Sequence, residues 1–270
     1  MDYQWIIDTL ESTWRDFDHY LTPRPQPDFD TPTALPGWSV HDLIGHLVGL
    51  TRVVLGEPVP THVGPWPEYV KNPLGELNEA FVAIYRRVPT SEVLAEFREV
   101  NRRALAELRA LDDEGWEKVG WSPEGDRPFH RLQETRIVDS WIHYMDARDA
   151  LGEPRDDPGV AADVVLNRLE AALPYVVGKK VAPRDGTLIR LDLTGARGRS
   201  VAILTEGGRA RAIASSEQAP DLVLVTPTST WWRRMAGRVS TDDVLFDVGT
   251  HVEGDHALAR RVADALLVLS

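Results

Sequence analysis

Two histidines and an aspartate have the residue types and the spacing of a divalent-metal site. Asp139 precedes His143 by four residues, so on a helix both side chains project from one face, one turn apart. His46 lies at helical spacing from Leu43 and Leu50, which directs its imidazole toward an apolar interior. A carboxylate and two neutral imidazoles would supply three ligands to a cation and leave a fourth position open, as in catalytic zinc sites.

Asp146 is a candidate supporting residue for this site. It follows His143 by three residues, so its carboxylate can accept the second N–H of that imidazole, as happens behind many metal-bound histidines. An Asp–His pair at this spacing is also common as a surface ion pair, and a histidine among leucines is often a packed core residue. On the residues alone, a metal site and ordinary helix packing therefore both remain open.

A second group of charged residues lies near the C-terminus. His251, Glu253, Asp255 and His256 could offer nitrogen and oxygen ligands. Asp255, however, directly precedes an apolar periodic segment, where a negative charge stabilises the N-terminus of a helix. We therefore expect a helix start here rather than a second metal site.

The elements that must position the first group are helices in the N-terminal half. Ser39-Val40-His41-Asp42 has the S-x-x-D form of a capping box, which predicts that the helix carrying His46 begins at Ser39. Apolar residues at helical spacing predict helices over residues 6–21, 39–55, 74–88, 91–111 and 129–151. Four or five helices with short to medium connections are typical of an antiparallel bundle.

The C-terminal part has a different pattern. After a helix predicted over residues 160–177, alternating and β-branched segments predict strands over 188–193, 200–204, 210–214 and 222–225, and helices over 228–238 and 256–267 close the chain. We therefore expect an α+β protein of two domains. We expect a helical domain over residues 1–155, which carries the candidate metal ligands, and a small α+β domain with a mostly antiparallel sheet over residues 156–270.

The composition of the 270 residues narrows the function. The chain has no cysteine, which excludes disulfides, thiolate metal sites and a thiol nucleophile of its own. Its 30 Lys and Arg against 42 Asp and Glu give a net charge of −12, which argues against binding to nucleic acid or to an anionic membrane. No long apolar run and no export signal occur, so we expect a cytoplasmic protein.

Three segments carry motifs. Residues 35–47 read LPGWSVHDLIGHL, residues 136–152 read RIVDSWIHYMDARDALG, and residues 252–258 read VEGDHAL. They are similar, in this order, to the P-G-W-[ST]-V-x-D-x-x-x-H, [ED]-x-W-x-H-x-x-D-x-R-x-A-x-G and V-x-G-D-x-x-L segments of the mycothiol-dependent maleylpyruvate isomerase family. This family belongs to the DinB-like metalloenzyme superfamily, and the resemblance spans essentially the whole chain.

The resemblance implies a DinB-like four-helix N-terminal domain with a metal held by His46, Asp139 and His143. Zinc is the usual ion, with nickel, iron or manganese as alternatives. The metal would bind the low-molecular-weight thiol mycothiol at its open position, lower the thiol pKa and hold the thiolate against a small electrophile. The reaction would be a cis–trans isomerisation or a thiol transfer. An arginine after a glycine in the C-terminal domain matches Arg238, which could clamp a carboxylate of the substrate or the thiol, with Asp146 supporting the metal site.

One departure from the family concerns the acidic ligand. The isomerase has a glutamate where this chain has Asp139, which is shorter by one methylene. A metal would then lie closer to this helix or be bound more weakly, and Glu134 is more than one turn away and points in another direction. Maleylpyruvate itself is therefore a doubtful substrate.

Two other functions remain open at this point. One is a metal-dependent hydrolase that uses a metal-bound hydroxide. The other is a non-catalytic protein that binds a small apolar ligand in an α+β domain reminiscent of sterol-carrier folds, with a vestigial metal site. In each case we expect a monomer or a homodimer.

Overall fold

The computed structural model describes residues 2–62, 64–154 and 159–269, and these fall into two compact units. The first unit contains the described residues up to 154 together with 159–161, and the second begins at residue 162. The predicted boundary between residues 155 and 156 lies outside the described residues. A helical first unit and a smaller second unit with a mostly antiparallel sheet confirm the predicted α+β fold class.

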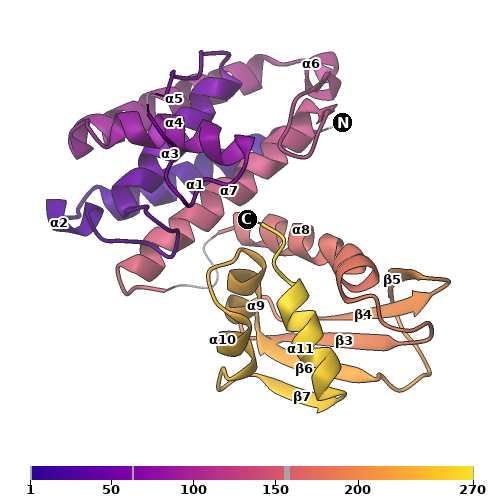
Figure 1. Ribbon diagram of the computed structural model, residues 1–270. Helices are drawn as coiled ribbons and strands as arrows, with labels where there is room; N and C mark the ends of the chain where they lie inside the picture. The colour runs from indigo at the N-terminus through magenta and orange to yellow at the C-terminus, as the bar shows by residue number, and fades with distance from the viewer. Residues whose placement is uncertain (1, 63, 155–158, 270) are drawn as a thin grey trace. The chain divides into compact units, whose positions relative to one another are not determined.

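The first unit is a helical bundle (Figure 1). Its elements are α1 (Gln4–Leu21), α2 (Gln26–Phe29), α3 (Val40–Val54), α4 (Pro73–Tyr85), α5 (Thr90–Ala110), α6 (Asp113–Glu117), β1 (Val119–Gly120), β2 (Arg127–Pro128) and α7 (Phe129–Ala150). Helices α1, α3, α5 and α7 pack together, and α4 packs against α3. The short elements α2, α6, β1 and β2 were not predicted, because two to five residues carry no readable periodicity.

Helix α3 is positioned by a capping box at its N-terminus and by a glycine face that packs against α4. Ser39 accepts a hydrogen bond from the Asp42 backbone N–H, and the Asp42 carboxylate accepts the Ser39 N–H at 2.9 Å, which is the predicted capping box. A Cβ added to Gly45 would lie 2.6 Å from Tyr85 Cβ, and one added to Gly49 would lie 2.3 Å from Phe81 Cγ. These glycines therefore permit the close approach of α4.

Helix α7 is deeply buried where it carries the candidate site residues. Nearly all its residues from Arg136 to Ala147 are buried, so its polar side chains must find partners inside the bundle. Ser140, for example, accepts a hydrogen bond from the Trp14 indole of α1 at 2.9 Å. The burial on all sides explains why this helix has little amphipathic pattern in the sequence.

The second unit contains a five-stranded sheet with helices packed against it (Figure 1). Its elements are α8 (Ala161–Tyr175), a π-helix (Val176–Val181), β3 (Leu188–Thr194), β4 (Arg199–Glu206), β5 (Arg209–Ile213), β6 (Leu222–Pro227), α9 (Thr228–Met235), α10 (Thr241–Leu245), β7 (His251–Gly254) and α11 (His256–Ala265). The strand order is β5-β4-β3-β6-β7, and only the β3–β6 pair is parallel. In the described part of the chain, no helix is long and apolar enough to cross a membrane.

Several elements of this unit differ from the predictions, and helix α10 was not predicted. Strand β7 was missed, because Val252 is its only apolar residue and most of the strand is exposed. Helix α9 ends at Met235 instead of residue 238, since Gly237 adopts φ +75° and its N–H closes on the carbonyl of Arg234. Helix α8 ends two residues early and continues as the π-helix.

Candidate metal centre

Helices α3 and α7 bring the three predicted ligands together. His46 Nε2 lies 3.3 Å from Asp139 Oδ2, and His143 Nε2 lies 3.4 Å from Asp139 Oδ1. The two imidazole rings stand edge to face with centroids 4.8 Å apart. One ligand atom from each residue lies within 4.8 Å of the other two. Both histidines are buried, whereas the Asp139 side chain keeps 28% of its surface exposed.

These separations suit ligation better than hydrogen bonding. A charge-assisted N–H···O bond has a length of about 2.7–2.9 Å, shorter than either histidine–aspartate distance. In a tetrahedral site with bonds of about 2.0–2.2 Å, neighbouring ligand atoms lie about 3.3–3.6 Å apart. The shorter Asp139 side chain still reaches both imidazoles, since its Oδ1 lies 3.4 Å from the Nε2 of each histidine. Two nitrogens and a carboxylate therefore form a donor set that fits zinc or another divalent transition-metal ion.

Asp146 lies behind His143 as the sequence predicts. Its Oδ2 is 3.0 Å from His143 Nδ1, and both side chains are buried. The hydrogen bond makes Nδ1 the protonated nitrogen of the neutral ring, which leaves the Nε2 lone pair directed at Asp139. Glu134 takes no part, since its carboxylate pairs with Arg131.

The charges of this cluster shift its protonation equilibria. Burial alone would lower the pKa of His143, but the carboxylates of Asp139 and Asp146 outweigh it and raise that pKa to about 9. Burial alone would raise the pKa of Asp139, but the charges of His46 and His143 outweigh it and hold that pKa far below its usual range. Without a metal, the cluster is therefore held together by charge, and a cation must displace a proton to bind.

Trp38 forms an aromatic wall beside the two histidines and was not predicted as a site residue. Its ring centroid lies 5.1 Å from that of His46 and 6.1 Å from that of His143. The indole N–H donates to Glu79 Oε2 at 3.0 Å, and Glu79 is 1% exposed. The P-G-W motif contains Trp38, but nothing in the sequence connects it with Glu79, which lies on α4.

Arg86 completes this support. Its Nη1 donates to Glu79 Oε1 at 2.6 Å and its Nε donates to Asp42 Oδ1 at 3.1 Å. Tyr69 donates its hydroxyl to Glu79 Oε1 at 3.1 Å. The ion pairs and the hydrogen bonds join the start of α3 to α4, so they fix the segment that carries Trp38.

The C-terminal candidates lie in the second unit. Arg238 is half-buried, and its Nη1 donates to the Ala236 carbonyl. Arg234 donates to the carbonyls of Ala263 at 2.8 Å and Asp264 at 2.9 Å and so caps the end of α11. Arg233 lies over the Trp232 ring.

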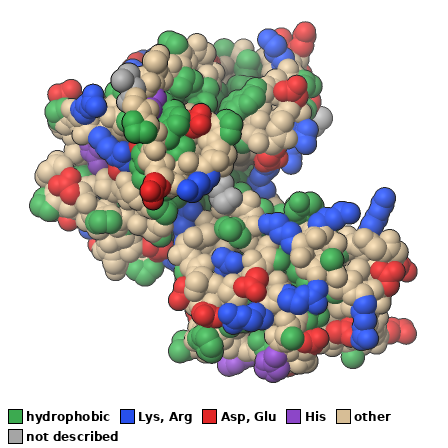
Figure 2. Space-filling view, viewed as in Figure 1, with side chains coloured by type: hydrophobic (Ala, Val, Ile, Leu, Met, Phe, Trp, Pro, Cys, Tyr) green, Lys and Arg blue, Asp and Glu red, His purple; other side chains and the backbone are tan. Residues whose placement is uncertain are grey.

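The second group of charged residues does not gather. His251, Glu253, Asp255 and His256 are exposed on β7 and the start of α11, and histidine surface is visible on the second unit in Figure 2. Asp255 accepts the Leu258 N–H at 2.9 Å as the predicted helix start. Within the described residues, these four form no group that could hold a metal.

Solved structures share this fold over nearly the whole chain. A crystal structure of the mycothiol-dependent maleylpyruvate isomerase matches with a TM-score of 0.59 at 16% identity, covering 94% of this chain and 93% of that one. A histidine-to-alanine mutant of a mycothiol-dependent maleylpyruvate isomerase matches with a TM-score of 0.57 at 15% identity and the same coverage.

Sequence comparisons assign the two units separately. An uncharacterized protein of Mycobacterium tuberculosis is 29% identical over 151 residues, which are 54% of this chain and 56% of the relative, so the chain spans about half the length of that relative. The SCP-2 sterol transfer family matches residues 166–267. The mycothiol maleylpyruvate isomerase N-terminal domain matches residues 10–148, just over half of the chain. The chain therefore belongs to the mycothiol maleylpyruvate isomerase family, as its motifs predicted.

Proposed function

We propose that the chain is an enzyme in which His46, Asp139 and His143 bind a divalent cation, with zinc as the best fit. The convergence of one carboxylate and two imidazoles from α3 and α7 carries this proposal. Three protein ligands leave a position for an exogenous group, which distinguishes catalytic from structural zinc sites. When bound, the cation would supply the Lewis acidity that lowers the pKa of a nearby thiol.

The proposed second cofactor is mycothiol, and the substrate is a small electrophile that is isomerised or receives the thiol. Membership of the family supports the thiol, and the absence of cysteine means that any sulfur nucleophile must come from outside the chain. A cytoplasmic location suits this chemistry, because thiols stay reduced there. Residues 1–155 are proposed as the metal-binding domain, and the protein is proposed to be a monomer or a homodimer.

The chain's own residues would prepare the site for this reaction. Asp146 holds the tautomer and the orientation of His143 through the 3.0 Å contact. Trp38 covers one side of the two imidazoles and limits access of water. Arg238 is proposed as a clamp for a substrate carboxylate, for which its planar guanidinium is suited.

A turnover assay tests the proposal. Zinc-supplemented protein and mycothiol are offered conjugated cis-diacids, maleylpyruvate included, and small alkylating electrophiles. We expect turnover of one of these substrate classes, and this turnover should need both zinc and thiol. His46→Ala should abolish the turnover, whereas the exposed control His256→Ala should not. Arg238→Lys should raise KM for a carboxylate substrate with less effect on kcat. Turnover of esters or amides without thiol would instead favour a hydrolase.

The match to the SCP-2 sterol transfer family favours one second candidate, a protein that binds a small apolar ligand in residues 166–267. The helices of this unit pack on a sheet with a largely apolar strand pair, β3 and β6. A thermal shift with lipids, combined with none on zinc addition, would support this function and leave the metal site vestigial.

A further inference from the structure

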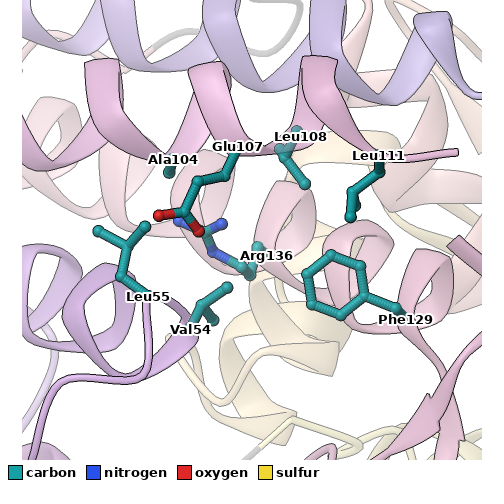
Figure 3. A pocket seen from close by; sticks show the side chains of 8 residues that line it. All are labelled: Val54, Leu55, Ala104, Glu107, Leu108, Leu111, Phe129 and Arg136. Atoms are coloured by element: carbon teal, nitrogen blue, oxygen red, sulfur yellow. The ribbon is translucent and has the colours of Figure 1, made fainter. Parts of the chain in front are cut away.

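A pocket lies at the end of the helical bundle, between α3, α5 and α7 (Figure 3). The empty space in and around it is about 300 Å³, which includes open solvent at its mouth. Apolar side chains form most of its wall, namely Val54, Leu55, Ala104, Leu108, Leu111 and Phe129. Two charged side chains also line it, Arg136 and Glu107.

Arg136 is a buried cation whose hydrogen bonds go to neutral acceptors. It is 6% exposed, and its Nη1 and Nη2 donate to Gln133 Oε1 at 2.9 Å and to Thr51 Oγ1 at 2.8 Å. Its guanidinium also lies over the Trp14 ring, 4.9 Å from the centroid. No carboxylate of the described residues pairs with it, although removing a charge from water is costly unless it is paired. Burial accordingly lowers the pKa of Arg136 to about 10, against the opposing charge of Asp139.

Besides these two acceptors, the network around Arg136 contains N–H groups that have no acceptor within the described part of the chain. A guanidinium has five N–H donors, and the two bonds above use two of them. Thr51 donates to Asn101 Oδ1 at 3.2 Å, and the amide nitrogens of Asn101 and Gln133 are buried without a hydrogen-bond partner among the described residues. The network therefore combines the positive charge of Arg136 with these N–H groups that lack an acceptor. An anion would satisfy both.

We propose that this pocket binds a small carboxylate with a short apolar chain, its carboxylate on Arg136 and its chain along the apolar wall. A guanidinium matches a carboxylate with two parallel hydrogen bonds, and an apolar wall suits a short hydrocarbon chain better than a phosphate or a sugar. Arg136 lies one turn before Asp139 on α7, but none of the three candidate metal ligands lines the pocket, so the pocket is a site of its own beside the candidate metal centre. The proposal holds whether or not that centre binds a metal.

Glu107 should lower the affinity of the pocket for a carboxylate. It is exposed at the pocket and, in Figure 3, its carboxylate projects toward the same space as the Arg136 side chain. A carboxylate ligand would approach this like charge, which weakens binding by a modest amount at an exposed position. Neutralising Glu107 should therefore strengthen binding, whereas neutralising Arg136 should weaken it.

The test is a titration of the whole chain with butyrate, followed by ligand-observed NMR or calorimetry, with uncharged butyramide as the matched ligand. The protein is first depleted of metal, because a carboxylate could otherwise coordinate a cation held by the candidate ligands. We expect saturable binding of butyrate and none of butyramide. Arg136→Gln should weaken butyrate binding by about tenfold or more, and Arg102→Gln, an exposed arginine on α5, should leave it unchanged.

A second variant keeps the test decisive if Arg136→Gln unfolds. Glu107→Gln changes an exposed residue and should raise the affinity for butyrate by about twofold to fivefold. Equal binding of butyrate and butyramide would overturn the proposal, as would binding by a folded Arg136→Gln variant that equals wild type. A loss of affinity in Glu107→Gln would also contradict it, since it would mean that Glu107 helps to hold the ligand.

Discussion

Two groups of histidine and acidic residues differ in whether the fold gathers and buries their side chains. His46, Asp139 and His143 come from two helices, converge within the bundle, and have a further carboxylate behind one imidazole. The group formed by His251, Glu253, Asp255 and His256 is nearly continuous in sequence, yet it stays exposed on β7 and α11. Closeness in sequence therefore says little about a metal site, whereas convergence of buried donors from separate helices says much more.

The cause of the difference is geometric. Along a strand, alternate side chains share a face, so His251 and Glu253 share one face of the exposed edge strand β7, and Asp255 is used as a helix cap. On α7, a spacing of four residues places Asp139 and His143 on one face, and α3 supplies the third donor across the bundle.

The largest effect is expected from removing a ligand. His46→Ala or His143→Ala should lower zinc affinity by more than the about 10- to 100-fold that loss of an outer-shell partner costs, because a direct ligand is lost. Competition with a zinc chelator measures the affinity. His251→Ala and His256→Ala are the matched controls and should leave zinc binding unchanged; an equal loss in both pairs would remove the distinction between the two groups.

A smaller effect is expected from the carboxylate behind His143. Asp146→Asn keeps the shape but weakens the acceptor for the Nδ1–H, and zinc affinity should fall by about 10- to 100-fold. Asp255→Asn, in the second group, should leave zinc affinity unchanged. Unaltered zinc binding in Asp146→Asn would show that its contact with His143 does not tune the site.

The pH dependence follows from the raised pKa of His143. Because its folded pKa is about 9 and its unfolded value is about 6.5, the ion pairs with Asp139 and Asp146 stabilise the metal-free fold fully below about pH 6.5, and this stabilisation is lost as the pH rises through about 9. Zinc needs the neutral ring, so its apparent affinity should rise by up to about tenfold per pH unit between these values. Chelator competition across this range, paired with urea unfolding of metal-free protein, measures both. A flat zinc profile would contradict the assignment of His143 as a ligand.

The smallest effect belongs to the second group and concerns stability. Asp255→Ala removes the 2.9 Å hydrogen bond to the Leu258 N–H at the start of α11, and should lower the free energy of unfolding by about 0.5–2 kcal/mol. Urea denaturation measures the change, and Asp255→Asn, which can still cap the helix, is the control. A stability equal to wild type would mean that Asp255 has no capping role.

The sequence predicted those features that rest on local spacing. The capping box at Ser39 and the long helices follow from periodicity and motifs within one or two turns. The expectation that His46 meets Asp139 and His143 rested on the family resemblance, because no local spacing links residues on two separate helices. The support by Glu79 and Arg86 could not be predicted, because these residues act on Trp38 from another helix and no local pattern links them. Strand β7 was missed for a related reason. It is a strand because it pairs with β6, and its own composition does not indicate one.

X-ray absorption at the zinc edge tests the central claim most directly, because it reports the ligand atoms themselves. In zinc-loaded protein we predict scattering from two imidazoles with nitrogen or oxygen neighbours at about 2.0–2.2 Å and no sulfur, since the chain has no cysteine. Mycothiol should add one sulfur at about 2.3 Å, which only the thiol can supply. Zinc bound without imidazole, or an unchanged spectrum in His46→Ala, would contradict the account.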